Sequence, residues 1–303
     1  MEPETYHIPA LLDAAIEGLN IKPDGVYVDA TFGGGGHSRA ILTKLGPDGR
    51  LFGFDRDLDA LANVPDDPRF TFVHSDFRYI SNFLHFHGVD HADGILADLG
   101  VSFHHFDSAE RGFSFRADAP LDMRMNRNGD RTAADLLAGY GKDDLERLLR
   151  AYTDLKRPGA IAAAIVRARD AAPLQTTSQL VEAVRGSINP KSEKKDLAQV
   201  FQALRIEVNG EMDALHGLLT QSLRVLRTGG RLAVITYHSI EDRMVKNFIR
   251  SGNTRGEIDK DIFGNVHTPW KAVTRSPITP DEAEVEANPR SRSAKLRVAE
   301  KTD

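Results

Sequence analysis

The chain contains no cysteine among its 303 residues. Without thiols, disulfides, thiolate zinc sites, iron–sulfur clusters and cysteine nucleophiles are all excluded. The sequence also lacks any apolar run approaching the roughly 20 residues of a membrane span, and its first residues lack the basic start and apolar stretch of a signal peptide. We therefore expect a cytoplasmic protein that makes no contact with membranes.

An excess of basic residues is absent as well. Lys+Arg 39 stand against Asp+Glu 44, which gives a net charge of −5, so any binding of nucleic acid must use local patches. Metal binding is not expected either, because the clustered histidines lack the regular spacing of helical ligands. These are His85, His87, His91, His104 and His105.

Short apolar runs alternate with helical patterns over the first hundred residues. The runs predict strands at 26–30, 50–54, 70–74 and 94–99, and helices are predicted at 38–45 and 58–64. Strands separated by helices indicate βαβ units and a parallel sheet covered on both faces. The fold class is therefore α/β.

The pattern changes after the fourth strand. Residues 101–130 are polar and irregular, 132–226 read as helical throughout, and strands return at 231–236 and 294–298. We expect an inserted all-helical domain at 105–205 for substrate recognition. A cofactor-binding domain would then be built from 1–104 and 206–303.

A glycine run and an acid indicate a nucleotide-like ligand. The run 33–36 follows the first strand and opens a helix, where backbone N–H groups are free and no Cβ blocks close approach. Asp55 ends the next strand, 22 residues after Gly33 (55 − 33), where a carboxylate can accept hydrogen bonds from ribose hydroxyls. Together they predict a cofactor that contains adenosine.

Asp29, at the end of the first strand, helps to choose between cofactors. A carboxylate there would repel the pyrophosphate of NAD but suits an amino group or a sulfonium. S-adenosylmethionine therefore fits better, and an NAD-dependent oxidoreductase stays as an alternative.

Several long motifs resemble the bacterial 16S rRNA cytosine-N4 methyltransferases. The matching stretches are VDATFGGGGHSR (28–39), DGILADLGVS (93–102), ERGFSFR (110–116), PLDMRM (120–125), FQALRIEVN (201–209), HSIEDR (238–243) and NPRSRSAKLR (288–297). The resemblance implies a class I methyltransferase (Rossmann-like) sheet with a helical insertion. It also implies methyl transfer from S-adenosylmethionine to the exocyclic N4 amine of a cytidine in the decoding region, the P site, of 16S rRNA.

The resemblance further implies which residues hold the cofactor. Asp55 would bind the ribose, and Phe77 would lie beside the adenine. The full set is Gly33, Gly35, Gly36, His37, Asp55, Phe77, Asp98 and His105. The family often has Ser-Pro-Gln where this chain has 103–105, which weakens the assignment of His105, and an arginine of the family's glycine loop is replaced by Gly34.

The residues themselves limit the chemistry. Methylation of a pyrimidine at C5 needs a cysteine nucleophile, so an amine or hydroxyl target remains. Hydrogen-bond acceptors can share the positive charge that develops on an attacking amine. Asp98 is the first candidate for this catalytic role, although it could bind the cofactor instead, and His238 is the second.

Arginines near aromatic residues suit phosphate contacts and base stacking. We assign Arg111, Arg116, Arg124 and Arg205 to substrate RNA, and the cations of 288–303 form a second basic patch. The expected partner is 16S rRNA in the small ribosomal subunit. A homodimer is left open, and a non-catalytic assembly factor that binds the cofactor and the subunit remains an alternative.

Overall fold

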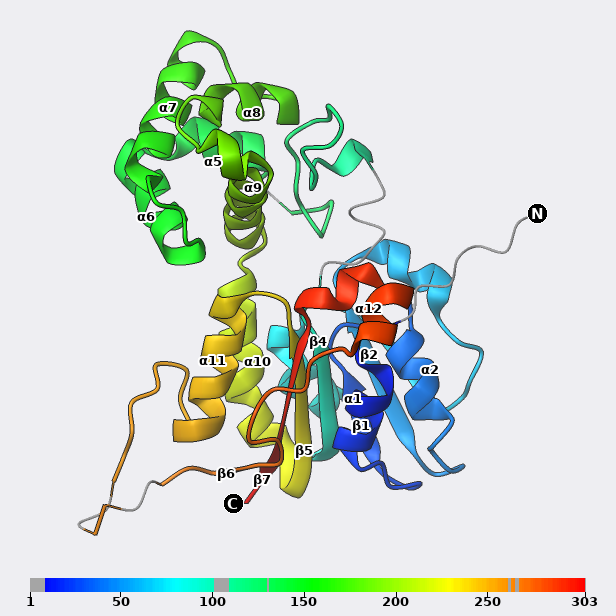
Figure 1. Cartoon of the computed structure of the whole chain (residues 1–303). Coiled ribbons are helices and arrows are strands. Elements are labelled where there is room, and N and C mark those ends of the chain that lie inside the picture. Colours follow the sequence, from blue (N-terminus) through cyan, green and yellow to red (C-terminus); the bar gives the residue numbers. More distant parts are fainter. Residues whose placement is uncertain (1–8, 101–108, 130, 261–262, 265–266, 303) are drawn as a thin grey trace. The chain divides into compact units, whose positions relative to one another are not determined.

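The computed structural model describes residues 9–100, 109–129, 131–260, 263–264 and 267–302 (Figure 1). The chain divides into two compact units. One is formed by 1–100 and 212–303, and the other by 101–211. Each unit is described by itself below.

The first unit is built on a seven-stranded sheet in the order β3-β2-β1-β4-β5-β7-β6. Its strands are β1 Val26–Asp29, β2 Arg50–Asp55, β3 Phe70–His74, β4 Ala92–Asp98, β5 Leu226–Thr236, β6 Trp270–Ala272 and β7 Lys295–Lys301. Neighbouring strands from β3 to β5 are parallel, whereas β7 is antiparallel to both β5 and β6. A parallel doubly wound sheet with an antiparallel β7 inserted before the last strand is the class I methyltransferase arrangement, so the predicted fold class is confirmed.

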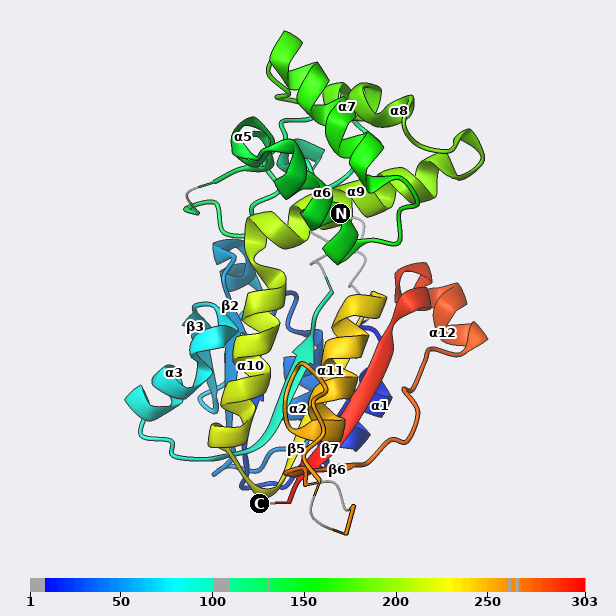
Figure 2. The ribbon, with the colours of Figure 1, turned by 90° about the vertical axis from the view of Figure 1, so that its left-hand side faces the viewer.

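Helices cover both faces of this sheet. Helices α1 (Leu12–Leu19) and α2 (Gly36–Leu42) lie on one face, and α3 (Ile80–Phe86), α10 (Glu211–Val225) and α11 (Ser239–Ser251) lie on the other (Figure 2). A short helix, α12 (Glu282–Ala287), and two 3-10 helices, η2 (Phe77–Tyr79) and η5 (Pro289–Ser293), complete the unit. The central strands are largely apolar and buried where helices cover both faces: β4 is buried over 92–97 and β5 over 232–236.

Some predicted elements differ in detail. The helix expected at 58–64 is a 3-10 helix, η1 (Leu58–Asn63), which Asp57 starts by accepting a hydrogen bond from the Asp59 N–H. The helix expected at 38–45 begins earlier, at Gly36, directly after the glycine turn. Helices α1, α3, α11 and α12 and strand β6 were not predicted.

The second unit is a helical bundle around its own core. Its helices are α5 Ala133–Gly139, α6 Lys142–Tyr152, α7 Pro158–Ala171, α8 Thr177–Arg185 and α9 Glu193–Asn209, with 3-10 turns η3 (Ala109–Arg111) and η4 (Pro190–Ser192). Thr132 and Thr176 start α5 and α8 with capping boxes. The boundary expected after residue 205 falls inside α9, because this helix continues to a left-handed C-cap at Gly210.

None of the helices in the described ranges is both long enough and apolar enough to cross a membrane.

Candidate functional site

The glycine turn between β1 and α2 needs glycine at particular positions. Gly33 and Gly35 have φ of 50° and 73°, in the left-handed region that side chains disfavour. At Gly36, a Cβ atom would lie 2.3 Å from Pro9 Cγ, because Pro9 packs closely against the start of α2. By contrast, a Cβ at Gly34 would meet nothing within 4 Å. The turn therefore leaves room for a side chain at the position where the related family often has arginine.

Asp55 joins the end of β2 to this turn. Its Oδ2 accepts a hydrogen bond from the Gly33 N–H at 2.8 Å, and its Oδ1 accepts one from the Asp57 N–H at 2.8 Å. Asn63 Nδ2 donates to the Gly33 carbonyl at 3.1 Å from the opposite side. Because each carboxylate oxygen can accept more than one hydrogen bond, Asp55 keeps acceptor capacity for the ribose that the sequence assigned to it.

Asp29 binds the residues around the turn through side-chain hydrogen bonds. It is only 1% exposed, and its two oxygens accept from the Ser38 hydroxyl at 2.7 Å and the Thr31 N–H at 3.1 Å. Burial raises the pKa of Asp29, and the nearby charge of His37 and the Ser38 hydrogen bond offset this only in part. A carboxyl group thus lies buried directly beneath the glycine turn.

Asp98 provides a second carboxyl group at the end of the neighbouring β4. Its Oδ2 lies 3.9 Å from His37 Nδ1, and its Oδ1 accepts from the Gly100 N–H at 3.3 Å. The Tyr237 hydroxyl also donates a hydrogen bond to this carboxyl. Burial raises the pKa of Asp98, which the charge of His37 and the Tyr237 hydrogen bond counteract in part.

Sequence reasoning missed Tyr237. It follows β5 directly, and β5 pairs with β4 so that Ile235 lies opposite Asp98. Aligning the ends of these two strands would have found it, since parallel strands present their carboxyl ends at one edge of the sheet.

The structure brings most of the predicted cofactor residues to this edge. The turn Gly33–Gly36, His37, Asp55 and Asp98 are linked by the contacts above. Phe77 begins η2 shortly after β3 and is half-buried, and Asp76 caps that turn by accepting from the Arg78 N–H. His105 lies outside the described residues.

His238, the second catalytic candidate, is the N-cap of α11. Its Nδ1 accepts from the Glu241 N–H at 3.4 Å, and its Nε2 lies 2.9 Å from Glu241 Oε1. These contacts start the helix, so His238 has a structural role. Its catalytic role stays a prediction.

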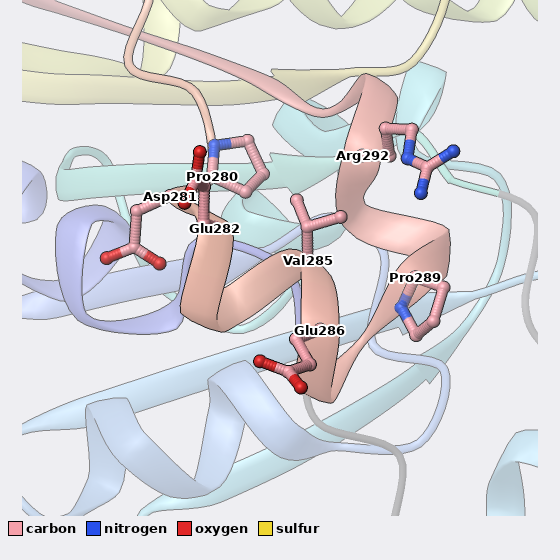
Figure 3. Close-up of a pocket in the computed structure, with 7 residues that line it drawn as sticks. All are labelled: Pro280, Asp281, Glu282, Val285, Glu286, Pro289 and Arg292. Atoms are coloured by element: carbon pink, nitrogen blue, oxygen red, sulfur yellow. The ribbon is translucent and has the colours of Figure 1, made fainter.

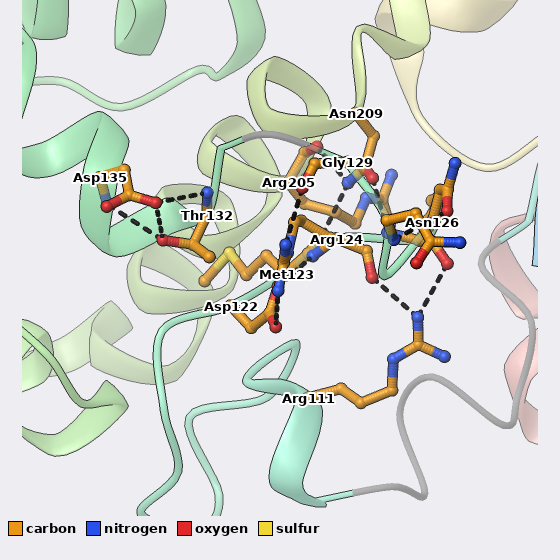
Figure 4. Close-up of polar contacts among 12 residues, drawn as sticks. Arg111, Asp122, Met123, Arg124, Asn126, Gly129, Thr132, Asp135, Arg205 and Asn209 are labelled. Carbon is orange, nitrogen blue, oxygen red and sulfur yellow. Dashed lines mark hydrogen bonds and ion pairs between the residues drawn. The ribbon is translucent and has the colours of Figure 1, made fainter.

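Three of the four arginines assigned to RNA serve the inserted unit internally (Figure 4). Arg124 binds both oxygens of Asp122 at 2.6 and 2.9 Å, and its Nη1 donates to the Gly129 carbonyl at 2.7 Å. Arg111 is 4% exposed and donates to the carbonyls of Arg124 and Met125.

Arg205 forms a two-bond pair with Glu211, at 2.9 Å for both contacts. The donors of Arg111, Arg124 and Arg205 are therefore used within the fold, and the RNA role expected of these three residues stays a prediction. Arg116 is exposed and remains available.

The C-terminal basic patch is also partly internal. Arg297 binds both oxygens of Asp242 at 2.7 and 3.2 Å, and Lys301 Nζ donates to the carbonyls of Leu223 and Leu226.

A surface hollow is formed by α12 and η5 (Figure 3). Its lining includes none of the predicted cofactor residues, so it does not mark the cofactor site.

Within the part of the chain that the structure describes, no three His, Asp or Glu side chains gather as metal ligands would.

Comparison with known proteins decides the family. The profile of the MraW methylase family matches residues 4–302. The chain belongs to the MraW methylase family. This membership confirms the predicted resemblance and makes the chain a methyltransferase that uses S-adenosylmethionine.

Two curated relatives of this methylase match along nearly the whole chain. A protein of Porphyromonas gingivalis (strain ATCC 33277) is 57% identical over 302 residues, covering 98% of this chain and 97% of the relative. One of Bacteroides thetaiotaomicron is 55% identical over 297 residues, covering 98% of each chain. Both are named ribosomal RNA small subunit methyltransferase H.

Among solved structures, an rRNA methylase from Streptococcus thermophilus is 12% identical, with a TM-score of 0.41 over 100% of this chain and 99% of that one. A likeness this weak adds no argument to the family assignment.

Proposed function

We propose that this methylase transfers a methyl group from S-adenosylmethionine to the exocyclic N4 amine of a cytidine in the decoding region, at the P site, of 16S rRNA in the small ribosomal subunit. The observation that carries the proposal is the full-length identity of 55–57% to proteins named as methyltransferases of small-subunit ribosomal RNA. The alternatives, an NAD-dependent oxidoreductase and a non-catalytic assembly factor, are disfavoured by membership of a methylase family.

The residues at the sheet edge fit this cofactor. The glycine turn admits close approach of a ligand to the backbone, and Asp55 at its side has acceptor capacity for ribose hydroxyls. Two carboxyl groups, the buried Asp29 and the partly buried Asp98, have raised pKa values because burial leaves their charge incompletely compensated. A cationic ligand would stabilise their ionised forms, whereas a pyrophosphate would not. When bound, S-adenosylmethionine supplies a methyl group on a positively charged sulfur.

Asp98 is the residue we assign to the reacting amine. As an anion it accepts hydrogen bonds from the amino protons and thereby stabilises positive charge that develops on nitrogen. Tyr237 and the Gly100 N–H hold the carboxyl group in place by donating to it. His37 supports the same group while its Nε2 lies 3.2 Å from the Ala10 carbonyl, which fixes the ring against the N-terminal segment.

We assign substrate recognition to the inserted unit 101–211, in which Arg116 is exposed. We also place the protein in the cytoplasm, where ribosomal RNA is assembled. A homodimer stays a prediction that sedimentation of the purified protein would test.

The test is methyl transfer from labelled S-adenosylmethionine to small subunits, and to their free rRNA, from cells that lack this enzyme. Digestion and mass spectrometry should find N4-methylcytidine at one position. Asp98→Asn should abolish transfer, whereas Asp135→Asn, which changes a capping carboxyl of α5, should leave transfer intact. Tight cofactor binding without any labelled nucleoside would contradict the proposal and favour the assembly factor. Binding of NAD in place of S-adenosylmethionine would favour the oxidoreductase.

A further inference from the structure

Helix α11 has an apolar face and a polar face of unusual composition. Its buried residues, including Val245 and Phe248, pack toward β5, β6 and β7. The opposite face points away from the sheet (Figure 2). The exposed residues of this helix are Ser239, Arg243, Lys246 and Arg250. None of them is acidic.

The two acids of α11 are directed elsewhere. Glu241 is 2% exposed and accepts from the Tyr237 N–H at 2.9 Å, beside the capping His238. Asp242 is bound by Arg297 at 2.7 Å and lies 4.0 Å from Lys295 Nζ. Neither carboxyl group neutralises a cation on the exposed face of its own helix.

The three cations lie along one stripe. Arg243, Lys246 and Arg250 are separated by three and four residues, a spacing that aligns side chains on one face of a helix. In the described ranges none of the three has a carboxylate within ion-pair distance, and Arg250 makes a single 3.4 Å contact with the Gly256 carbonyl. With a rise of about 1.5 Å per residue, the stripe extends about 10 Å along the helix.

Several surface cations of the inserted unit are paired with acids of the same helix. On α6, Arg150 pairs with Glu146 at 2.6 Å, Lys142 lies 4.0 Å from the same carboxyl group, and Arg147 pairs with Asp144. On α8, Arg185 pairs with Glu182 at 2.6 Å. On α11, by contrast, three cations without an ion pair in the described ranges are aligned on one face, and their mutual repulsion favours an external anion.

We propose that this α11 stripe binds the phosphate backbone of the substrate RNA. The inference rests on the proposed function and adds a contact surface within the cofactor-binding unit. Helix α11 begins directly after β5, at the sheet edge where Asp98 and Tyr237 meet. An RNA strand that delivers a base to this edge therefore has phosphates within reach of the stripe. Evenly spaced, flexible cations suit phosphates rather than bases.

The test uses the full-length protein and a labelled transcript of small-subunit rRNA. The triple variant Arg243→Gln, Lys246→Gln, Arg250→Gln removes three charges from the stripe. A matched control, Lys44→Gln, Arg224→Gln, Lys271→Gln, removes the same charge from exposed positions shortly after α2, on α10 and on β6 that have no ion pair in the described ranges. The dissociation constant of the RNA is measured over a series of salt concentrations, and cofactor affinity is measured in parallel.

The stripe variant should bind RNA about tenfold or more weakly near 0.15 M salt, and the slope of log Kd against log salt should fall by about 2, since each phosphate contact on a single strand contributes about 0.7. The control should keep the slope of the wild type. Cofactor affinity should be unchanged in both.

Equal behaviour of the two triple variants would overturn the inference, because net charge alone would then explain the effect. Unchanged affinity for the transcript combined with reduced methylation of assembled subunits would also overturn it, and would assign the stripe to a ribosomal protein. If the wild-type protein methylates no rRNA, the proposed function itself fails, which is a separate result.

Discussion

Replacing Tyr237 with phenylalanine tests how the Tyr237 hydroxyl favours the ionised form of Asp98. The hydroxyl of Tyr237 donates to the Asp98 carboxyl, and this hydrogen bond lowers a pKa that burial raises. Without it, the anion loses a donor and the pKa of Asp98 rises further. The fraction of enzyme with an ionised Asp98 then falls at every pH below that new value.

The size of the effect follows from the kind of hydrogen bond lost. A hydrogen bond to a charged group contributes about 1.5–3 kcal/mol. The Asp98 side chain is 19% exposed, and it retains the Gly100 N–H, so the lower half of this range applies. Since 1.4 kcal/mol is about tenfold, kcat/KM should fall about 10- to 30-fold where Asp98 titrates. The deficit should narrow as pH rises, because the carboxyl group then ionises without help.

The assay is the pH dependence of methyl transfer for the wild type and Tyr237→Phe, with thermal unfolding as a check on folding. Tyr140→Phe is a matched control, because its hydroxyl donates to Glu207 at 2.5 Å within the inserted unit. We expect that control to lose about 1 kcal/mol of stability while its pH profile keeps its shape. A deficit of Tyr237→Phe that is the same at every pH would refute the reasoning and leave Tyr237 as a packing residue.

Two further predictions follow from the turn and from the inserted unit. Gly36→Ala should cost about 1–3 kcal/mol of stability and weaken cofactor binding, because its Cβ would displace Pro9 and the adjacent Ala10 that contacts His37. Gly34→Ala, which meets nothing within 4 Å, should change neither quantity in unfolding and calorimetric titrations, and equal behaviour of the two variants would contradict the turn geometry. Although burial alone would raise the pKa of Asp122, hydrogen bonds from Arg124 hold it below its ordinary value. The ion pair therefore stabilises the fold at pH values above the ordinary pKa of an aspartate, and this stabilisation is lost as the pH falls through the lower pKa of the folded state. Asp122→Asn should be less stable than the wild type by about 1–3 kcal/mol at pH 7, and its stability should fall less on acidification. Urea unfolding midpoints at several pH values measure both effects.

The sheet was predictable because its strands are continuous apolar runs. The strand expected at 70–74 is β3 with the same bounds, and those around Asp29, Asp55 and Asp98 differ by one or two residues. Helix α11 was not predicted, although its apolar positions have a helical spacing. Its amphipathic pattern is clear once Val245, Phe248 and Ile249 are counted together.

The burial of individual arginines could not be predicted from the sequence. Arg111 and Arg116 lie five residues apart beside the same aromatic residues, yet one is buried and the other exposed. The difference comes from the carbonyl groups of Arg124 and Met125, which the fold places at Arg111. The sequence shows that a guanidinium group is present. It does not show which backbone carbonyls the fold brings within hydrogen-bonding distance, because every residue has a carbonyl.

The acidic sheet edge connects stability with function. Because burial raises the pKa values of Asp29 and Asp98, the folded chain binds more protons than the unfolded chain between the ordinary value and the raised one, and stability falls as pH rises through that window. At neutral pH the site thus keeps two carboxyl groups whose ionisation is opposed by their surroundings, with His37 as a partial counter-charge. At the proposed cofactor site, the positive charge of S-adenosylmethionine would relieve that cost, so the proposed affinity and the cost of ionising this edge would have the same physical origin. The same arrangement would leave Asp98, in the role we propose for it, a strong hydrogen-bond acceptor for positive charge that develops on the amine.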